Sequence, residues 1–219
     1  MRKTILFTRP CYDLPTEYLH YISGQLVGSL KFADEHAIID LAGKGVLRSD
    51  FEKAVKKGSP GLVVLNGHGT KDAIYGAADE IVLDGQNVRI LASRIVYAVA
   101  CDSLEGLGQL AVNAGQAACY VGYGANFMII VDPTRTAAPG KDKNIKPFVQ
   151  VYATTVLSLA AGLTVAESIR NTKEKIKSLI KEYGVYGIRD RYGDAPLIRW
   201  ALYWDLFFLS AHGDLDACF

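Results

Sequence analysis

The chain has 219 residues, of which 50% are hydrophobic and 21% are charged, and its formal net charge is +1. This composition is typical of a globular protein with a sizeable core, and the length fits one domain over residues 1–219. The near-neutral charge excludes a dedicated nucleic-acid binder, which would carry a strong basic excess.

Through residue 122, apolar segments of strand length alternate with segments of helical pattern. The expected strands are residues 4–8, 37–41, 61–65, 94–100 and 117–122, with a short extended piece at 81–83. The expected helices are residues 14 to about 30, 48–57 and 104–114. Asp13 and Pro15 are typical of the start of the first helix, and Ser49 is the expected N-cap of the second. The alternation predicts a mostly parallel sheet with helices on both faces.

After Ile130 the pattern changes. Residues 132–146 are polar and contain prolines, as expected for a loop. Two helices follow, at 148–161 and 164–183, and Thr164 with Glu167 forms a capping box at the start of the second. The apolar tail predicts a short helix at 196–202 and then a last strand at 204–210.

Four cysteines lie far apart in the sequence and lack the spacing of metal ligands. The apolar stretch near the N-terminus is too short for the hydrophobic region of a signal peptide. No apolar run reaches the roughly 20 residues that a membrane-spanning helix needs. We therefore expect reduced thiols in a cytoplasmic protein, with no membrane segment, no metal and no cofactor.

Two of the predicted strands end in residues of chemical interest. LVVLNGHG runs apolar and then delivers His68 between two glycines, and IVYAVACDS runs apolar and then delivers Cys101. Parallel strands end at the same edge of a sheet, where sites of open α/β sheets form. If the two strands are neighbours, an imidazole and a thiol meet at this edge.

An imidazole beside a thiol has a clear chemical use. The thiolate is the attacking species, and a free cysteine is only a few per cent ionised near neutral pH. His68 can take the proton of Cys101. The helix expected after Ser103 would lower the pKa of the Cys101 thiol further through its N-terminal dipole.

Backbone groups complete this predicted site. Gly69 lets the chain turn and bring its N–H close to a substrate carbonyl, and the Cys101 N–H is the natural second donor of an oxyanion hole. Because side chains alternate along a strand, Asn66 shares a face with His68, and Val99 shares one with Cys101. We expect Asn66 and Val99 to be walls of the substrate pocket.

Each feature also has an ordinary structural interpretation. A lone His-Gly is commonly a turn with a surface histidine, and a lone cysteine at a strand end is commonly a small buried side chain. It is their occurrence together, on successive long strands, that favours a functional site. Cys119, inside a strand, and Cys11 and Cys218, in a turn and at the chain end, are expected to be structural.

The order of these motifs resembles the caspase-like cysteine peptidases, and within them the CHAT branch. The resemblance is carried by five stretches, which are LVVLNGHGT, YGAADEIVLDG, RIVYAVACDS, LGQLAVNAGQAACYVGYGANFMIIVD and PFVQVYATTVLSLAAGLTVAESIRNTKEKI. It implies a three-layer sandwich with a mostly parallel sheet of about six strands. It also implies a thiol protease, a hydrolase of peptide bonds, with Cys101 as nucleophile and His68 as general base.

The sequence gives fewer indications of substrate preference and regulation than of the fold. An acidic residue near the cleft would favour Arg or Lys before the scissile bond. Asp102 and Asp132 are the candidates, although either could instead cap a helix or a turn. The loop at 132–146 follows a strand end, so it could gate the cleft or be cut itself. The resemblance implies a protein or peptide substrate and an external regulatory partner, with no nucleic acid and no membrane.

Two alternatives remain open at the level of sequence. One is a catalytically inactive caspase-like module that acts as a scaffold or sensor, since a fold does not dictate a function. The other is a nucleotide-binding domain, suggested by Gly122-Tyr123-Gly124-Ala125 at a strand exit. This stretch lacks the full dinucleotide-binding pattern, and no helix clearly follows it.

Overall fold

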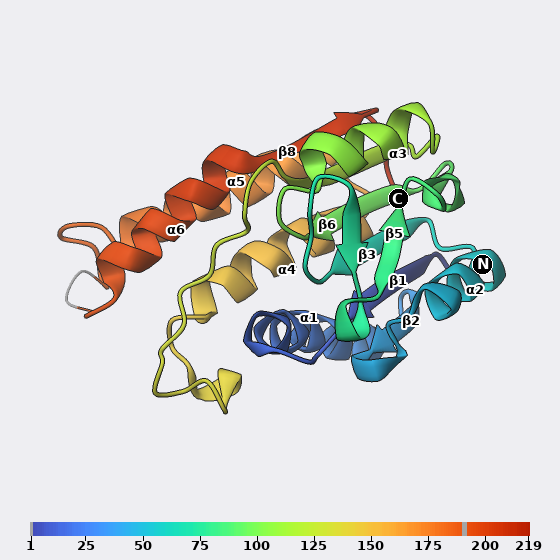
Figure 1. Ribbon diagram of the computed structural model, residues 1–219. Helices are drawn as coiled ribbons and strands as arrows, with labels where there is room; N and C mark the ends of the chain where they lie inside the picture. Colours follow the sequence, from blue (N-terminus) through green and yellow to red (C-terminus); the bar gives the residue numbers. More distant parts are fainter. Residues whose placement is uncertain (1, 190–191) are drawn as a thin grey trace.

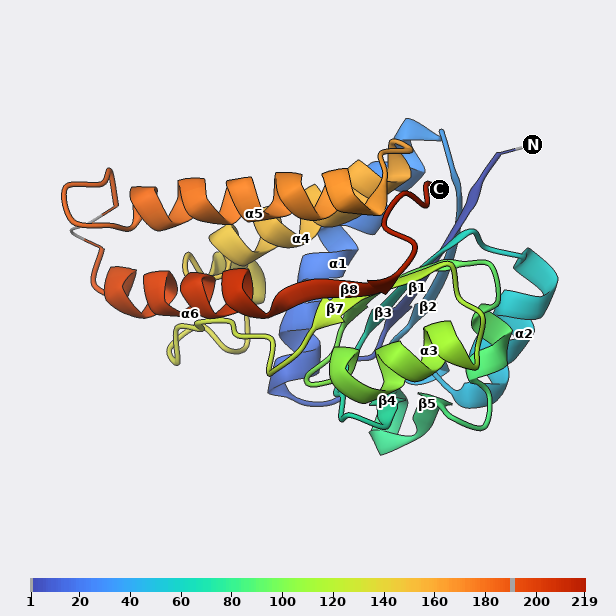
Figure 2. The ribbon, with the colours of Figure 1, turned by 90° about the horizontal axis from the view of Figure 1, so that it is seen from above.

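A six-stranded sheet forms the middle layer of the chain (Figures 1 and 2). The computed structural model describes residues 2–189 and 192–219. The strand order is β2-β1-β3-β6-β7-β8, and β8 alone runs antiparallel to its neighbour. The strands are β1 Thr4–Arg9, β2 Ala37–Ala42, β3 Leu62–Asn66, β6 Ile95–Val99, β7 Cys119–Tyr123 and β8 Leu209–Gly213.

Helices cover both faces of the sheet (Figure 2). One face packs against α1 Leu14–Ala33, α4 Lys146–Ala160, α5 Val165–Glu182 and α6 Ala195–Phe208. The other packs against α2 Arg48–Gly58, α3 Gln109–Asn113 and the small antiparallel pair of β4 Ala73–Tyr75 and β5 Ile81–Asp84. Short helical turns lie at Gly43–Gly45, Ala77–Asp79, Val88–Leu91 and Pro139–Lys141, and a π-helical turn lies at Leu104–Gly108.

The inner strands are buried on both faces, as their continuous apolar sequences predict. Phe7, Val64 and Tyr97 contribute to the core under α1 and α4. Their immediate neighbours in sequence point the opposite way, into the core under α2 and α3, because successive side chains of a strand alternate. The central sheet thus separates two apolar cores.

None of the described helices is apolar over a length that would cross a membrane.

The structure corrects two local predictions. Ser49 does not cap α2, because the helix begins at Arg48 with Leu47 as its N-cap and without a side-chain cap. The strand expected at 204–210 is helical up to Phe208, and β8 begins only at Leu209. The aromatic residues of this tail favour a strand locally, whereas its buried residues follow helical spacing. Those buried residues are Ala195, Ile198, Ala201, Leu202 and Asp205.

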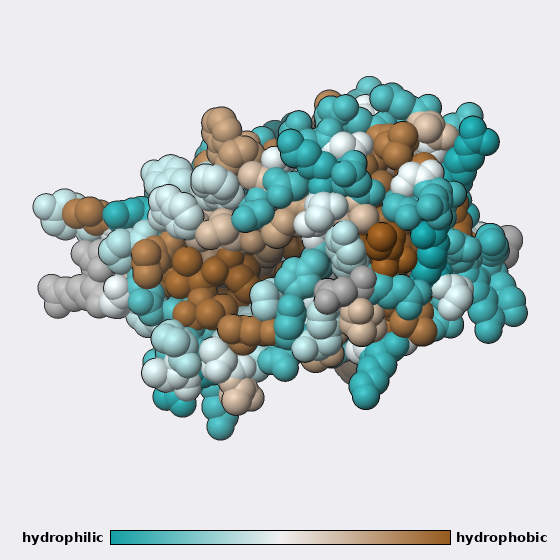
Figure 3. Space-filling view, in the orientation of Figure 1, coloured by the Kyte–Doolittle hydropathy of each residue, from teal (hydrophilic) through white to brown (hydrophobic). Residues whose placement is uncertain are grey.

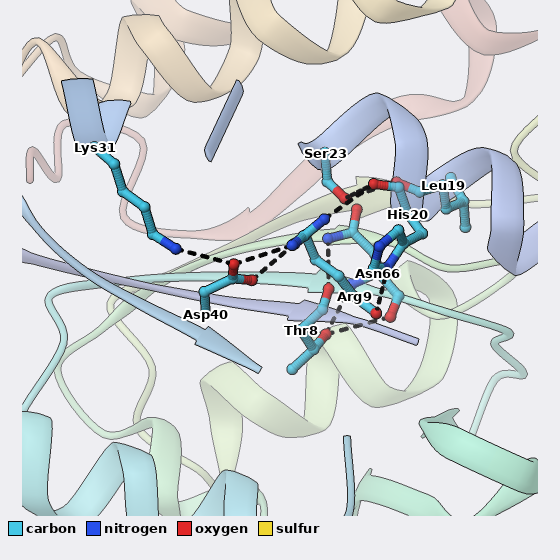
Figure 4. Close-up of polar contacts among 8 residues, drawn as sticks. All are labelled: Thr8, Arg9, Leu19, His20, Ser23, Lys31, Asp40 and Asn66. Carbon is cyan, nitrogen blue, oxygen red and sulfur yellow. Dashed lines mark hydrogen bonds and ion pairs between the residues drawn. The ribbon is translucent and has the colours of Figure 1, made fainter. Parts of the chain in front are cut away.

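A polar network fixes the carboxyl end of β1 (Figure 4). The Arg9 guanidinium binds both carboxylate oxygens of Asp40, at 2.7 and 3.0 Å, and also donates to the His20 carbonyl. One residue earlier, the Thr8 carbonyl accepts from the Asn66 side-chain amide at 2.7 Å. These contacts tie α1, β2 and β3 to β1 at the edge of the sheet where the strands end.

The Arg9–Asp40 pair is nearly buried, since the two side chains are only 11% and 14% exposed. Burial alone would raise the pKa of Asp40, but the hydrogen bonds and charges of Arg9 and Lys31 outweigh it and lower that pKa. A carboxyl whose pKa is lowered by folding stabilises the folded state above its unfolded pKa. That stabilisation is lost as the pH falls through the folded pKa.

We predict that Arg9→Ala lowers the free energy of unfolding by about 3 kcal/mol at neutral pH, because it leaves a buried carboxylate with weaker compensation. The difference from the wild type should shrink as Asp40 becomes protonated below about pH 4. Denaturant unfolding at several pH values measures both effects. Arg2→Ala, which breaks the exposed Arg2–Asp34 pair, is the control and should cost less than about 1 kcal/mol. Equal losses for both variants would contradict the prediction.

Candidate active site

The ends of β3 and β6 lie side by side in the sheet. Their parallel register runs from Leu62–Ile95 to Asn66–Val99. His68 and Cys101 each follow two residues after the last of these pairs, so both leave the sheet at the same edge. The condition set by the sequence analysis, that the two strands are neighbours, is therefore met.

Gly69 shows how closely the two strand ends approach. A Cβ atom added to Gly69 would lie 2.5 Å from the Cys101 carbonyl oxygen and 2.8 Å from both the carbonyl carbon and the Cβ of Ala100. These distances are too short for any side chain, so glycine is required for the backbone contact. The backbone next to His68 therefore packs directly on the backbone of Cys101.

His68 is held by a residue from a third element. Gly67, at φ 152°, has a backbone conformation that other residues rarely adopt, and it lies between the end of β3 and His68. The His68 side chain is 38% exposed, and its Nε2 lies 2.6 Å from Oδ2 of Asp13. Asp13 precedes α1, which follows β1, the other neighbour of β3 in the sheet. The imidazole is therefore fixed between two adjacent strand exits.

Asp13 also begins α1. Its Oδ1 accepts hydrogen bonds from the Thr16 N–H at 3.0 Å and from the Thr16 hydroxyl at 2.6 Å, and that hydroxyl in turn accepts from the Asp13 N–H. This is a capping box, which satisfies helix N–H groups that have no partner within the helix. One carboxylate oxygen thus caps the helix while the other binds His68.

The charge state of Asp13 determines the tautomer of His68. Burial would raise the pKa of Asp13, but hydrogen bonds from Thr16 and His68 outweigh it, and the pKa is lowered. Asp13 is therefore an ionised acceptor at neutral pH, and His68 Nε2 donates to it. In neutral His68 this leaves the lone pair on Nδ1, where a proton can be accepted.

Cys101 is half-buried, in the turn between β6 and the π-helical turn. Burial raises the pKa of its thiol, the carboxylates of Asp102 and Asp205 add to the increase, and a hydrogen bond from the Phe127 N–H opposes it. The expected lowering of this pKa by a helix N-terminus is therefore wrong. No hydrogen bond joins His68 to Cys101 among the residues described.

Two backbone amides at this edge, those of Gly69 and Cys101, have no backbone acceptor on another described residue. Gly69 pairs with Ile74 in an isolated antiparallel bridge, whose hydrogen bonds are made by the flanking residues. Within the described part of the chain, the N–H groups of Gly69 and Cys101 donate no hydrogen bond to another residue's backbone. Both amides thus stay candidates for the oxyanion donors expected from the sequence.

Asn66 and Val99 do not line a cavity, contrary to the sequence prediction. Both are fully buried, on the face of the sheet that α1 and α4 cover. The Asn66 side chain instead donates to the Thr8 carbonyl and joins β3 to β1. At the last position of each strand, these two side chains point into the core.

Asp132 closes a local turn. Its Oδ1 accepts from the N–H and the hydroxyl of Thr134, at 2.8 and 2.7 Å. Its own N–H donates to the buried carboxylate of Asp142, which also accepts from the Tyr18 hydroxyl of α1 at 2.8 Å. These contacts attach the loop at 132–146 to α1 and do not join Asp132 to His68 or Cys101.

In the sequence, Asp13 is recognisable only as a helix cap. Its second role could have been inferred from strand order, because Asp13 follows β1 and β1 pairs with β3. The contacts of Phe127 and Asp205 with the site have no comparable signal in the sequence. Among residues 2–189 and 192–219, no three His, Cys, Asp or Glu side chains are grouped to hold a metal ion.

No protein-family model and no curated protein matches the chain significantly. Solved structures, in contrast, do match the chain. The crystal structure of the Arg-specific cysteine proteinase gingipain R matches 99% of this chain at 14% identity and a TM-score of 0.58. The complex of the pro- and mature domains of RgpB from Porphyromonas gingivalis matches 98% at 13% identity and a TM-score of 0.59. The chain spans 47% of the length of each matched chain.

At this identity the likeness shows the fold. The expected fold class, a caspase-like three-layer sandwich with a mostly parallel six-stranded sheet, is confirmed. The Arg-specific cysteine proteinase activity is a property of the matched gingipain.

We predict that Gly69→Ala lowers the free energy of unfolding by about 1–3 kcal/mol, because the new methyl group forces the ends of β3 and β6 apart. Denaturant unfolding measures the loss. Gly28→Ala is the matched control, since nothing lies within 4 Å of a Cβ at this exposed position of α1. That variant should gain about 0.5–1 kcal/mol, because alanine favours helix more than glycine does. An unchanged stability of Gly69→Ala would show that the two strand ends are not in contact.

Proposed function

We propose that the chain is a cysteine endopeptidase in which Cys101 attacks the peptide carbonyl and His68 moves the proton. One observation carries the proposal. An imidazole fixed by an ionised carboxylate stands at the sheet edge where the Gly69 backbone packs on the backbone of Cys101. A nucleophile, a base and a group that orients the base are the recurring parts of acyl-transfer sites.

The first half of the reaction forms an acyl-enzyme. The substrate carbonyl oxygen accepts hydrogen bonds from the N–H groups of Gly69 and Cys101. The sulfur attacks the carbonyl carbon as its proton passes to Nδ1 of His68, and the carbonyl becomes an oxyanion. When this intermediate collapses, the C–N bond breaks, the amine leaves with the proton from His68, and a thioester to Cys101 remains. Each oxyanion donor is worth about 3 kcal/mol of barrier.

Water completes the cycle. His68 takes a proton from a water molecule, whose oxygen attacks the thioester, and the same two amides stabilise the second oxyanion. The C–S bond then breaks, the acid product leaves and the thiol regains its proton from His68. Asp13 keeps its negative charge throughout and stabilises the imidazolium that forms in both halves.

The raised pKa of Cys101 explains why a base is needed. The thiol is almost fully protonated at neutral pH, so attack requires transfer of its proton within the bound complex. The ionised Asp13 lies against the imidazole and stabilises the positive charge that this transfer creates. In this proposal the imidazole approaches the sulfur when substrate is bound, since catalytic hydrogen bonds tighten in the substrate complex.

One observation favours the alternative of a non-catalytic scaffold or sensor. Burial raises the thiol pKa, and no hydrogen bond links the thiol to His68 among the described residues. A cysteine that serves only as a small core side chain would look the same. The two roles differ in whether Cys101 reacts with a substrate-like electrophile.

Several further features are part of the proposal. Four of these features stay predictions from sequence. They are membership of the CHAT branch, a single domain over residues 1–219, protein or peptide substrates, and a role of Asp132 in substrate binding. All four cysteines are free, which supports a reducing compartment such as the cytoplasm. The matched RgpB complex contains a pro-domain with its mature domain, and this supports a regulatory protein partner here.

We predict that Cys101→Ala and His68→Ala each abolish cleavage of a fluorogenic peptide library, because the nucleophile and the base act as a unit. Cys119→Ala, at a fully buried thiol in β7, is the control for losing a sulfur and should keep activity in the fraction that folds. Cleavage by the Cys101→Ala variant would contradict the mechanism.

A peptidyl acyloxymethyl ketone distinguishes enzyme from scaffold. Simple alkylation is less selective, because Cys218 is exposed whereas Cys101 is half-buried. The probe is therefore used on a Cys218→Ser background and its site is read by mass spectrometry. Labelling of Cys101 that requires His68 supports the peptidase, and absence of labelling supports the scaffold.

We predict that Asp13→Asn lowers kcat/KM roughly 10²- to 10⁴-fold with little change in stability. Asparagine caps helices as well as aspartate does, so α1 is preserved. The negative charge that stabilises the imidazolium during proton transfer is lost. Asp13→Ala, which removes both roles, should also destabilise the fold by about 1 kcal/mol. Steady-state kinetics and thermal unfolding of the two variants separate the roles. Wild-type kcat/KM in Asp13→Asn would show that Asp13 serves only the helix.

A further inference from the structure

A groove lies between α2 and the segment that leads from β5 to β6, and Figure 2 shows the two side by side. Its volume is about 630 Å³, which is within the range of about 300–1,000 Å³ that small-molecule sites have. The charged residues that line it are four basic ones and one acidic one, namely Arg48, Lys56, Arg89, Arg94 and Glu52. Because the net charge of the whole chain is only +1, the groove concentrates positive charge.

Two of the four cations are already compensated by carboxylates. The Arg48 guanidinium donates to both oxygens of Asp84, at 3.1 and 3.0 Å, and to Oε1 of Glu52 at 3.2 Å. The Lys56 Nζ lies 3.7 Å from the other oxygen of Glu52. The one acidic residue of the lining is therefore shared by these two cations, and Arg89 and Arg94 remain.

Arg94 is half-buried and comes immediately before β6. Its Nη1 donates to the Ala92 carbonyl at 2.7 Å, whereas its buried Nε has no hydrogen-bond partner among the described residues. Burial lowers the pKa of this guanidinium, and no neighbouring carboxylate offsets the change. The group still keeps its charge at neutral pH. A partly buried charge of this kind is costly unless an anion compensates it.

Arg89 is held at the groove by the helical turn Val88–Leu91. Val88 and Leu91 are buried in the core under α2, whereas Arg89, between them, is exposed and lines the groove. The turn is fixed from one side by Asn87, whose side-chain amide donates to the Val82 carbonyl at 2.8 Å. Arg89 makes no ion pair with any described side chain. A second guanidinium without a carboxylate thus borders the same groove from an anchored turn.

The chemistry of the groove matches a phosphate group. Guanidinium groups present paired N–H donors that fit phosphate oxygens, and they form stronger hydrogen bonds with an anion than with a neutral acceptor. Beside the two arginines, Ile90 adds apolar surface to the lining. Figure 3 shows mainly hydrophilic residues around α2, at the right of the view in Figure 1. The groove therefore suits a small polar ligand with a short carbon part.

We propose that this groove binds the phosphate group of a small molecule, with the guanidinium groups of Arg89 and Arg94 on the phosphate and Ile90 against the carbon part. The groove lies beside the start of β6, whereas Cys101 follows the end of that strand. The inference therefore concerns a second site and does not depend on the proposed function.

Isothermal titration calorimetry at constant ionic strength tests the ligand class with three probes, which are phenyl phosphate, inorganic phosphate and phenol. We expect saturable binding of phenyl phosphate and no binding of phenol, because the phosphate supplies the charge that the arginines bind. Phenyl phosphate should bind several-fold more tightly than inorganic phosphate if the carbon part contacts Ile90. Equal affinities for these two probes would assign the groove to free phosphate.

Variants locate the binding. Arg89→Gln and Arg94→Gln should each weaken the binding of phenyl phosphate roughly ten-fold or more, because each removes charge-assisted hydrogen bonds. Arg89 is exposed, so its variant tests the proposal even if Arg94→Gln fails to fold. Arg170→Gln is the matched control, since it removes the same charge from an exposed position of α5, on the other face of the sheet. It should leave the affinity within about two-fold of the wild type.

Two results would overturn the inference. One is the absence of saturable binding of both phosphates to the wild type at millimolar concentration, and the other is an unchanged affinity in Arg89→Gln. Neither readout involves peptide hydrolysis. A chain that cleaves peptides but binds no phosphate loses this inference alone, and a chain that binds phosphate but cleaves no peptide loses only the proposed function.

Discussion

The parallel register between β3 and β6 is the constraint on which the site depends. It carries His68 and Cys101 to the same edge of the sheet, at equal distances beyond the last paired residues. Contact is then completed by small residues, because Gly69 packs on the backbone of Ala100 and Cys101 where no side chain fits. The site is thus a consequence of strand order and of one close backbone approach.

Asp13 links the fold to the chemistry. The same carboxylate caps α1 and holds the imidazole of His68, so the start of a core helix is also a part of the site. Behind it, the buried pair of Arg9 and Asp40 fixes the end of β1, from which the loop to Asp13 departs. The orientation of His68 therefore depends on the packing of α1 against the sheet.

Much of the fold, and the sheet edge that carries the candidate site, was predictable from the sequence. Apolar runs located the inner strands, and the capping box of Thr164 and Glu167 is present as expected. Parallel strands end at the same edge of a sheet, so the strand ends in the sequence located the edge that His68 and Cys101 share, while their catalytic roles stay predictions. Asp13, Asp205 and the raised thiol pKa depend on helix packing and burial, which a sequence does not display. The 204–210 segment was assigned to a strand because its aromatic residues obscured helical spacing.

A crystal structure of the adduct with a peptidyl acyloxymethyl ketone tests the central claim most directly. The account predicts a bond from the Cys101 sulfur to the inhibitor, with Nδ1 of His68 turned towards the inhibitor and Nε2 still on Asp13. Reaction at another thiol, or an imidazole facing away from the bound inhibitor, would contradict a site formed by the ends of β3 and β6.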